Sequence, residues 1–145
     1  MKKTRFFFMV AVCVMVSECR AEVDYGCTWE FRVVNNTEKS VTIERNWGVE
    51  QNLSIMPSGG LTIFSSNTEC SKQDGDLADL YPHEGMILPL FPSSTASFQI
   101  KVGDELLPEV VMKRKFWEYI SEKYYGVYTL ILSDELIETI NNEQL

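Results

Sequence analysis

The chain has 145 residues, of which 13 are Lys or Arg and 21 are Asp or Glu, so its formal net charge is −8. This length suits one domain with an ordinary hydrophobic core. A chain this acidic repels nucleic-acid phosphates and anionic lipid surfaces, so the composition argues against nucleic acid as a partner.

Residues 1–21 have the layout of a secretory signal peptide. Basic residues precede an apolar run over 6–16, and Cys19 and Ala21 supply small residues at a cleavage site. The run is shorter than the roughly twenty residues of a transmembrane helix, so we expect export and not a membrane span. We therefore expect a signal peptide and one domain, 22–145, in the periplasm, at the cell surface or outside the cell. Removing four basic residues and one acidic residue leaves that domain with a net charge of −11.

A lipid anchor is the alternative to simple cleavage after Ala21. Residues 16–19, Val-Ser-Glu-Cys, are similar to a loose bacterial lipobox, in which Cys19 would be acylated and become the first residue. Glu18 departs from that pattern, which has a small residue at this position.

Cleavage leaves two cysteines, Cys27 and Cys70. In an oxidising compartment such a pair normally forms a disulfide bond. The bridge would close a loop of about forty residues and contribute about 3–4 kcal/mol in the chain-entropy model. Two free thiols are the alternative.

Alternation of apolar and polar residues predicts short strands in the mature chain. Two segments, 113–124 and 134–141, suit either a helix or a strand, although Ser133 and the two acids after it favour a helix start. We expect an all-β fold, an antiparallel β-sandwich of about seven strands, with a short C-terminal helix as one outcome. The expected strands cover 27–33, 40–47, 53–56, 61–65, 96–102 and 127–132.

The segment Gly126-Val127-Tyr128-Thr129-Leu130 is similar to the tyrosine-corner strand of immunoglobulin-like domains. With the signal peptide, the Asn-Asn-Thr turn at 35–37 and the Met-Pro-x-Gly-Gly turn at 56–60, the chain resembles small exported immunoglobulin-like sandwich proteins and lipoproteins of gut anaerobic bacteria. The resemblance covers most of residues 25–136 and implies the fold. It implies no activity, because many proteins of this kind have no assigned function.

Motifs that carry chemistry are scarce. His83 is the only histidine, and no Gly-x-Ser-x-Gly, His-Glu-x-x-His or Walker-type loop occurs, so we predict no catalytic residue and no cofactor. Asp74, Asp76 and Asp79 are weak candidates for a calcium site, because hard cations bind several carboxylates of one short loop. A solvated acidic loop is the alternative.

The aromatic residues and the one basic run suggest binding. Trp117 and Tyr125 are candidate exposed rings that could stack on sugars, and filling of the core is the alternative. The basic run 113–115 either pairs with the chain's own acids or docks an acidic partner.

The sequence therefore predicts first a secreted, non-enzymatic binding or structural module for an unknown protein or glycan. A carbohydrate-binding module is the first alternative. A small carboxylate-dependent hydrolase is the second, because the distance between two carboxylates cannot be read from a sequence.

Overall fold

A computed structural model describes residues 25–49, 52–70, 77–88 and 98–143. The predicted signal peptide with Cys19 lies outside the described residues, as do Asp74 and Asp76. The described chain consists mainly of strands, which confirms the predicted all-β class. In chain order the elements are β1 (Tyr25–Asn35), β2 (Val41–Arg45), β3 (Asn52–Ile55), β4 (Gly60–Cys70), β5 (Phe98–Val102), β6 (Glu105–Leu106), the 3-10 helices η1 (Glu109–Met112) and η2 (Arg114–Phe116), β7 (Trp117–Glu122), β8 (Tyr125–Leu132) and α2 (Asp134–Asn142).

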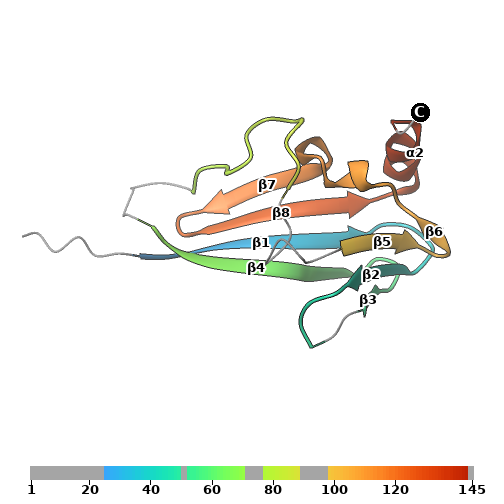
Figure 1. Cartoon of the computed structure of the whole chain (residues 1–145), viewed down its shortest axis with the longest axis horizontal. Helices are drawn as coiled ribbons and strands as arrows, with labels where there is room; N and C mark the ends of the chain where they lie inside the picture. The colour runs from blue at the N-terminus through green and yellow to red at the C-terminus, as the bar shows by residue number, and fades with distance from the viewer. Residues whose placement is uncertain (1–24, 50–51, 71–76, 89–97, 144–145) are drawn as a thin grey trace, which may run out of the picture.

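The strands form two four-stranded sheets that share one core (Figure 1). The long sheet has the order β4-β1-β8-β7, and the short sheet has the order β3-β2-β5-β6. All strand pairs are antiparallel except β1 and β8, which run parallel from Thr28 opposite Tyr125 to Asn35 opposite Leu132. The predicted sandwich is confirmed; the described residues form eight strands where about seven were expected, with this one parallel pair.

One long bent hairpin links the two sheets. β1 pairs with β4 in the long sheet, and their continuations β2 and β3 pair in the short sheet. Asn35 holds the bend because its buried amide donates to the carbonyls of Lys39, at 2.8 Å, and Ile55, at 3.1 Å. The amide oxygen accepts the Thr37 N–H at 3.0 Å. A short polar side chain thus satisfies the backbone where the chain passes from one sheet to the other.

The core follows from the alternation of residues in β1. Cys27, Trp29, Phe31 and Val33 are all buried, as the pattern predicts, and they lie on the face of the long sheet that points into the sandwich. The short sheet contributes mainly β-branched residues to the same core: Val41, Ile43, Ile55, Ile100 and Val102.

The two ambiguous segments take different structures. Residues 113–124 form neither one helix nor one strand: the 3-10 helix η2 is followed by strand β7. The C-terminal segment is the helix α2, whose N-cap Ser133 accepts the Leu136 N–H at 3.2 Å. Strand β6 after Gly103 ends at Leu106, because Pro108 interrupts the strand and precedes the 3-10 helix η1. Among the described helices, none is long and apolar enough to cross a bilayer.

Candidate functional site

A row of four aromatic rings crosses the inner face of the long sheet, one ring from each strand. In the order β4, β1, β8, β7 the rings are Phe64, Phe31, Tyr128 and Tyr119, and each lies opposite the next in the strand register. Their centroids are 5.7, 5.1 and 4.6 Å apart along the row. Aromatic pairs at these separations stabilise a sheet beyond the area that they bury.

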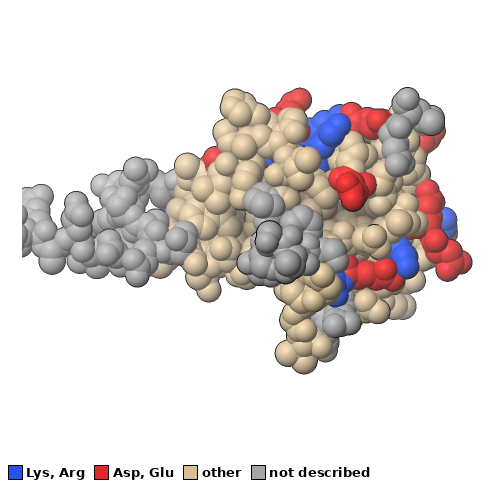
Figure 2. Space-filling view, in the orientation of Figure 1, with Lys and Arg blue, Asp and Glu red and all other residues tan. Residues whose placement is uncertain are grey.

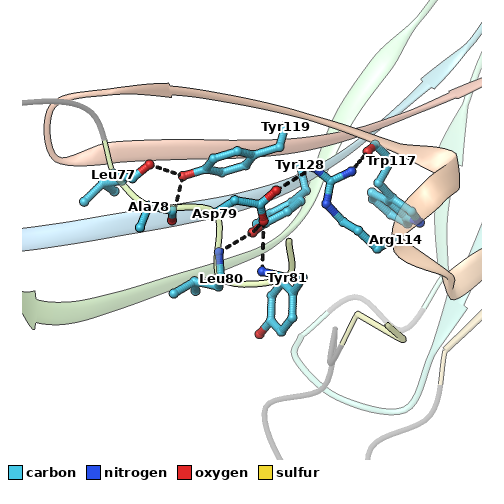
Figure 3. Close-up of polar contacts among 9 residues, drawn as sticks. All are labelled: Leu77, Ala78, Asp79, Leu80, Tyr81, Arg114, Trp117, Tyr119 and Tyr128. Carbon is cyan, nitrogen blue, oxygen red and sulfur yellow. Dashed lines mark hydrogen bonds and ion pairs between the residues drawn. The ribbon is translucent and has the colours of Figure 1, made fainter. Parts of the chain in front are cut away.

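Residues 77–88, called the strap here, contact the tyrosine end of this row (Figure 3). The Tyr119 hydroxyl lies 2.8 Å from the Leu77 carbonyl oxygen, to which it donates. The Leu80 N–H donates to the Tyr128 hydroxyl at 2.9 Å. Further along, the Leu88 N–H donates to the Met112 carbonyl at 2.9 Å, which fixes the other end of the strap. Polar groups of the strap are therefore satisfied by the hydroxyls of Tyr128, whose ring lies in the core, and Tyr119, whose ring packs against the core.

Asp79 is the centre of the polar contacts between strap and sheet. Its Oδ1 accepts the Tyr128 hydroxyl at 2.6 Å and the Tyr81 N–H at 2.9 Å, and its Oδ2 accepts Arg114 Nη2 at 2.7 Å. We call Asp79, Arg114 and Tyr128 the clamp. The clamp joins the strap, η2 and β8, which are far apart in the sequence (Figure 3).

Arg114 extends the clamp to the start of β7. Its Nη1 donates to the Trp117 carbonyl, and its guanidinium carbon lies 5.5 Å from the centre of the Tyr128 ring. The side chains of Arg114 and Asp79 are only 18% and 23% exposed. An ion pair this sheltered, with hydrogen bonds on both oxygens of the acid, contributes more to stability than a solvated pair does.

The clamp shifts two pKa values in opposite directions. For Asp79, burial raises the pKa, but hydrogen bonds from Arg114, Tyr128 and the Tyr81 backbone outweigh burial and hold the pKa below its ordinary value. For Tyr128, burial is the largest cause and the hydrogen bond to Asp79 adds to it, so the pKa lies well above its ordinary value. The clamp therefore consists of a charged carboxylate and a neutral hydroxyl at neutral pH.

The clamp does not have the geometry of a tyrosine corner. In that motif the tyrosine hydroxyl bonds to backbone a few residues upstream. Here the Tyr128 hydroxyl bonds to Asp79 and Leu80, nearly fifty residues upstream. The sequence gives no signal for this arrangement, because neither residue lies at a motif spacing from Tyr128.

The two residues predicted to stack on sugars, Trp117 and Tyr125, do not form a pair of exposed rings. Trp117 is a core residue, 1% exposed, and its Nε1 donates to the Val111 carbonyl at 2.9 Å. The expectation that this ring is exposed is wrong, because β7 directs it inward. Tyr125 is 37% exposed, and a hydrogen bond from its hydroxyl is the largest cause that lowers the Glu30 pKa. One exposed tyrosine therefore remains of the predicted pair.

The calcium hypothesis rested on Asp74, Asp76 and Asp79. Only Asp79 belongs to the described residues, and both of its oxygens already accept hydrogen bonds within the chain. Among the described residues, no group of three His, Cys, Asp or Glu side chains is arranged to hold a metal ion.

The basic run pairs with the chain's own acids. Arg114 forms an ion pair with Asp79. Glu143, at the end of α2, forms ion pairs with Lys113, whose Nζ lies 3.9 Å from Glu143 Oε2, and with Lys115. The two pairs with Glu143 link the end of α2 to the segment before β7. Figure 2 shows acidic atoms gathered around basic ones at the end of the molecule that carries α2 and β6.

The strand register brings the two predicted disulfide residues close together. Cys27, a buried residue of β1, lies opposite Thr68 of β4, and Cys70 is two residues further along β4. The two cysteines therefore occupy diagonal positions of one antiparallel pair.

Comparison with protein-family models, curated proteins and solved structures finds no match for this chain. The resemblance to exported immunoglobulin-like proteins therefore stays a prediction.

Proposed function

We propose that this chain is an exported, non-enzymatic binding module. The observation that carries the proposal is that the Asp79 carboxylate and the Tyr128 hydroxyl already have hydrogen-bond partners within the chain. Both Asp79 oxygens accept hydrogen bonds from the chain, and the Tyr128 hydroxyl, beneath the strap, both donates and accepts. A general acid or base needs a proton position that a substrate can reach, so this cluster is better suited to fixing the strap than to catalysis.

Export is proposed from the signal peptide over 1–21, with a lipid anchor at Cys19 as the alternative form of the exported protein. The diagonal positions of Cys27 and Cys70 support a disulfide bond between them, which an oxidising compartment would maintain. Such a bridge would tie β1 to the end of β4.

Binding is favoured over a purely structural role by the apolar residues that the fold leaves outside. Among the described residues, five large apolar side chains are at least 49% exposed, at well separated positions of the chain: Val49, Met56, Ile87, Leu106 and Ile120. Single exposed apolar residues are ordinary, but a binding module uses some of them in its interface.

A cross-linking scan in the native host tests the proposal. A photo-reactive residue is placed at each of these five positions in turn, and the chain is recovered after irradiation. We expect at least one position to give a cross-link to another exported molecule, with an unirradiated sample of the same variant as the control. Recovery of the chain without any cross-linked product from all five variants contradicts the proposal.

A further inference from the structure

The strap is held to the rest of the fold in two different ways along its length. Its later part, residues 84–88, is held by backbone hydrogen bonds. The Met86 carbonyl accepts the Arg114 N–H at 2.7 Å, and the Leu88 N–H donates to the Met112 carbonyl at 2.9 Å. This part of the strap is therefore joined to the segment before β7 by main-chain contacts.

Residues 77–81, called the leading segment here, are joined to β7, β8 and η2 by the side chains of those elements (Figure 3). The contacts run to the hydroxyls of Tyr119 and Tyr128 and to the guanidinium of Arg114. The leading segment itself has no helix or strand. An element that is held by side-chain tips, without a ladder of backbone hydrogen bonds, belongs to the part of a fold that opens most easily.

The three groups that hold the leading segment have a clear chemical preference. Arg114 provides a cation for an acid, the Tyr119 hydroxyl donates to backbone carbonyls, and the Tyr128 hydroxyl accepts a backbone N–H. Arg114 also lies between two lysines in the basic run 113–115, so the local charge favours an acid although the whole chain is acidic. A short peptide with an acid at its centre satisfies all three groups, as the leading segment does.

We propose that the leading segment is an autoinhibitory contact, which occupies a site for a short acidic peptide of another protein and leaves that site while both sheets stay folded. The acid of the partner then pairs with Arg114 in place of Asp79. This inference rests on the proposed binding function and names the surface and the partner class. The closed segment lowers the apparent affinity for the partner in proportion to the fraction of molecules in which the site is open.

Native-state hydrogen exchange of the wild-type mature chain tests whether the leading segment opens by itself. The Leu80 N–H is released when the segment leaves Tyr128, and the Leu88 N–H is released when the later part of the strap leaves Met112. We expect Leu80 to be at least about tenfold less protected from exchange than Leu88 and than the amides of β8. Equal protection would show that the segment opens only with the whole fold, and it would overturn the inference.

Peptide binding to Asp79→Ala tests the occupant of the site. Fluorescence anisotropy compares the end-blocked peptide Leu-Ala-Asp-Leu-Tyr, the sequence of the leading segment, with Leu-Ala-Asn-Leu-Tyr, which lacks the acid. We expect Asp79→Ala to bind the aspartate peptide about tenfold more tightly than the wild type does, because its site is open more often and its Arg114 has no acid of its own. The asparagine peptide should bind Asp79→Ala about tenfold more weakly than the aspartate peptide does.

The matched control is Glu143→Gln, which changes the net charge by the same one unit and leaves the clamp intact. It removes an acid that pairs with Lys113 and Lys115, and it is expected to bind the aspartate peptide as the wild type does. If this control tightens binding as much as Asp79→Ala does, the affinity follows net charge and the inference is overturned. Equal affinities of Asp79→Ala for the two peptides, or no binding of either, overturn it as well.

Two further measurements keep the test decisive. If Asp79→Ala does not fold, the milder Asp79→Asn takes its place with the same expectations, and the exchange measurement needs no variant. The cross-linking scan separates the two proposals: a cross-linked partner together with no peptide binding leaves the binding function standing and removes this site as the place that serves it.

Discussion

Removing the Asp79 carboxylate is expected to destabilise the fold strongly. Asp79→Ala leaves the Arg114 guanidinium, 18% exposed, without its counter-ion, and it leaves the buried Tyr128 hydroxyl without its acceptor. Breaking a fully buried ion pair costs about 3–5 kcal/mol, and an exposed pair contributes about 0–1 kcal/mol. Because this pair is sheltered but not fully buried, breaking it should lower the unfolding free energy by about 2–3 kcal/mol. The Tyr128 hydroxyl left without an acceptor should lower it by about 1 kcal/mol more.

Urea unfolding at pH 7 measures this change as a lower midpoint with an unchanged slope. Asp79→Asn is expected to lower the unfolding free energy by about half as much as Asp79→Ala, because its amide oxygen still accepts a hydrogen bond from the Tyr128 hydroxyl. The matched control is Glu143→Gln, which removes the acid from the more solvated pairs with Lys113 and Lys115 and should cost less than about 1 kcal/mol. The reasoning is refuted if Asp79→Ala costs no more than Glu143→Gln.

The Asp79 contribution should also depend on pH. Because the pKa of Asp79 is lower in the folded chain than in the unfolded chain, its stabilisation is complete above the unfolded-state value of about 4. It is lost as the pH falls through the folded-state value. The difference in unfolding free energy between the wild type and Asp79→Asn should therefore become smaller below about pH 4. A difference that stays constant would contradict a lowered pKa of Asp79 in the folded chain.

Three further predictions concern Gly126, Asn35 and Tyr128. A Cβ on Gly126 would lie 2.8 Å from the Tyr119 hydroxyl oxygen, so Gly126→Ala should lower the unfolding free energy by about 1–3 kcal/mol. The control is Gly26→Ala, which should lower it far less because a Cβ there meets nothing within 4 Å. Similar losses in the two variants would contradict the packing argument. Asn35→Ala removes the amide that donates to the carbonyls of Lys39 and Ile55 at the sheet-crossing bend, so it should lower the unfolding free energy by about 2–4 kcal/mol in urea. The control is Asn36→Ala, at the exposed residue beside it, which should stay near the wild type. The raised pKa of Tyr128 favours the neutral hydroxyl in the folded chain, so the unfolding free energy should fall above about pH 10 by up to about 1.4 kcal/mol per pH unit. Tyr128→Phe should flatten that slope. An unchanged slope in this variant would contradict the raised pKa of Tyr128.

The sequence predicts the strands better than their partners. Alternation identifies β1 and its buried residues, because side chains of a strand point to opposite faces by turns. Alternation does not say which strands pair, and the parallel contact between β1 and β8 therefore has no counterpart in the prediction. Helix α2 could be anticipated from the Ser133 cap and the acids after it.

The candidate site was less accessible to sequence reasoning. Asp79 and Arg114 are separated by 35 residues, and a strap that crosses the sheet brings them together. No local pattern encodes such a contact. Trp117 was misassigned because a single aromatic residue at the start of a strand can point either way, and only the packing of η2 and β7 fixes its direction.

The intact mass of the chain recovered from its native host tests most directly whether it is an exported module. The account predicts a chain that begins at Glu22 and is two hydrogens lighter than its reduced form, which establishes cleavage and the bridge between Cys27 and Cys70 together. An acylated chain that begins at Cys19 would also be exported and would place the module at a membrane surface. A full-length chain that still carries residues 1–21, with both thiols of the mature segment open to alkylation, would contradict the account.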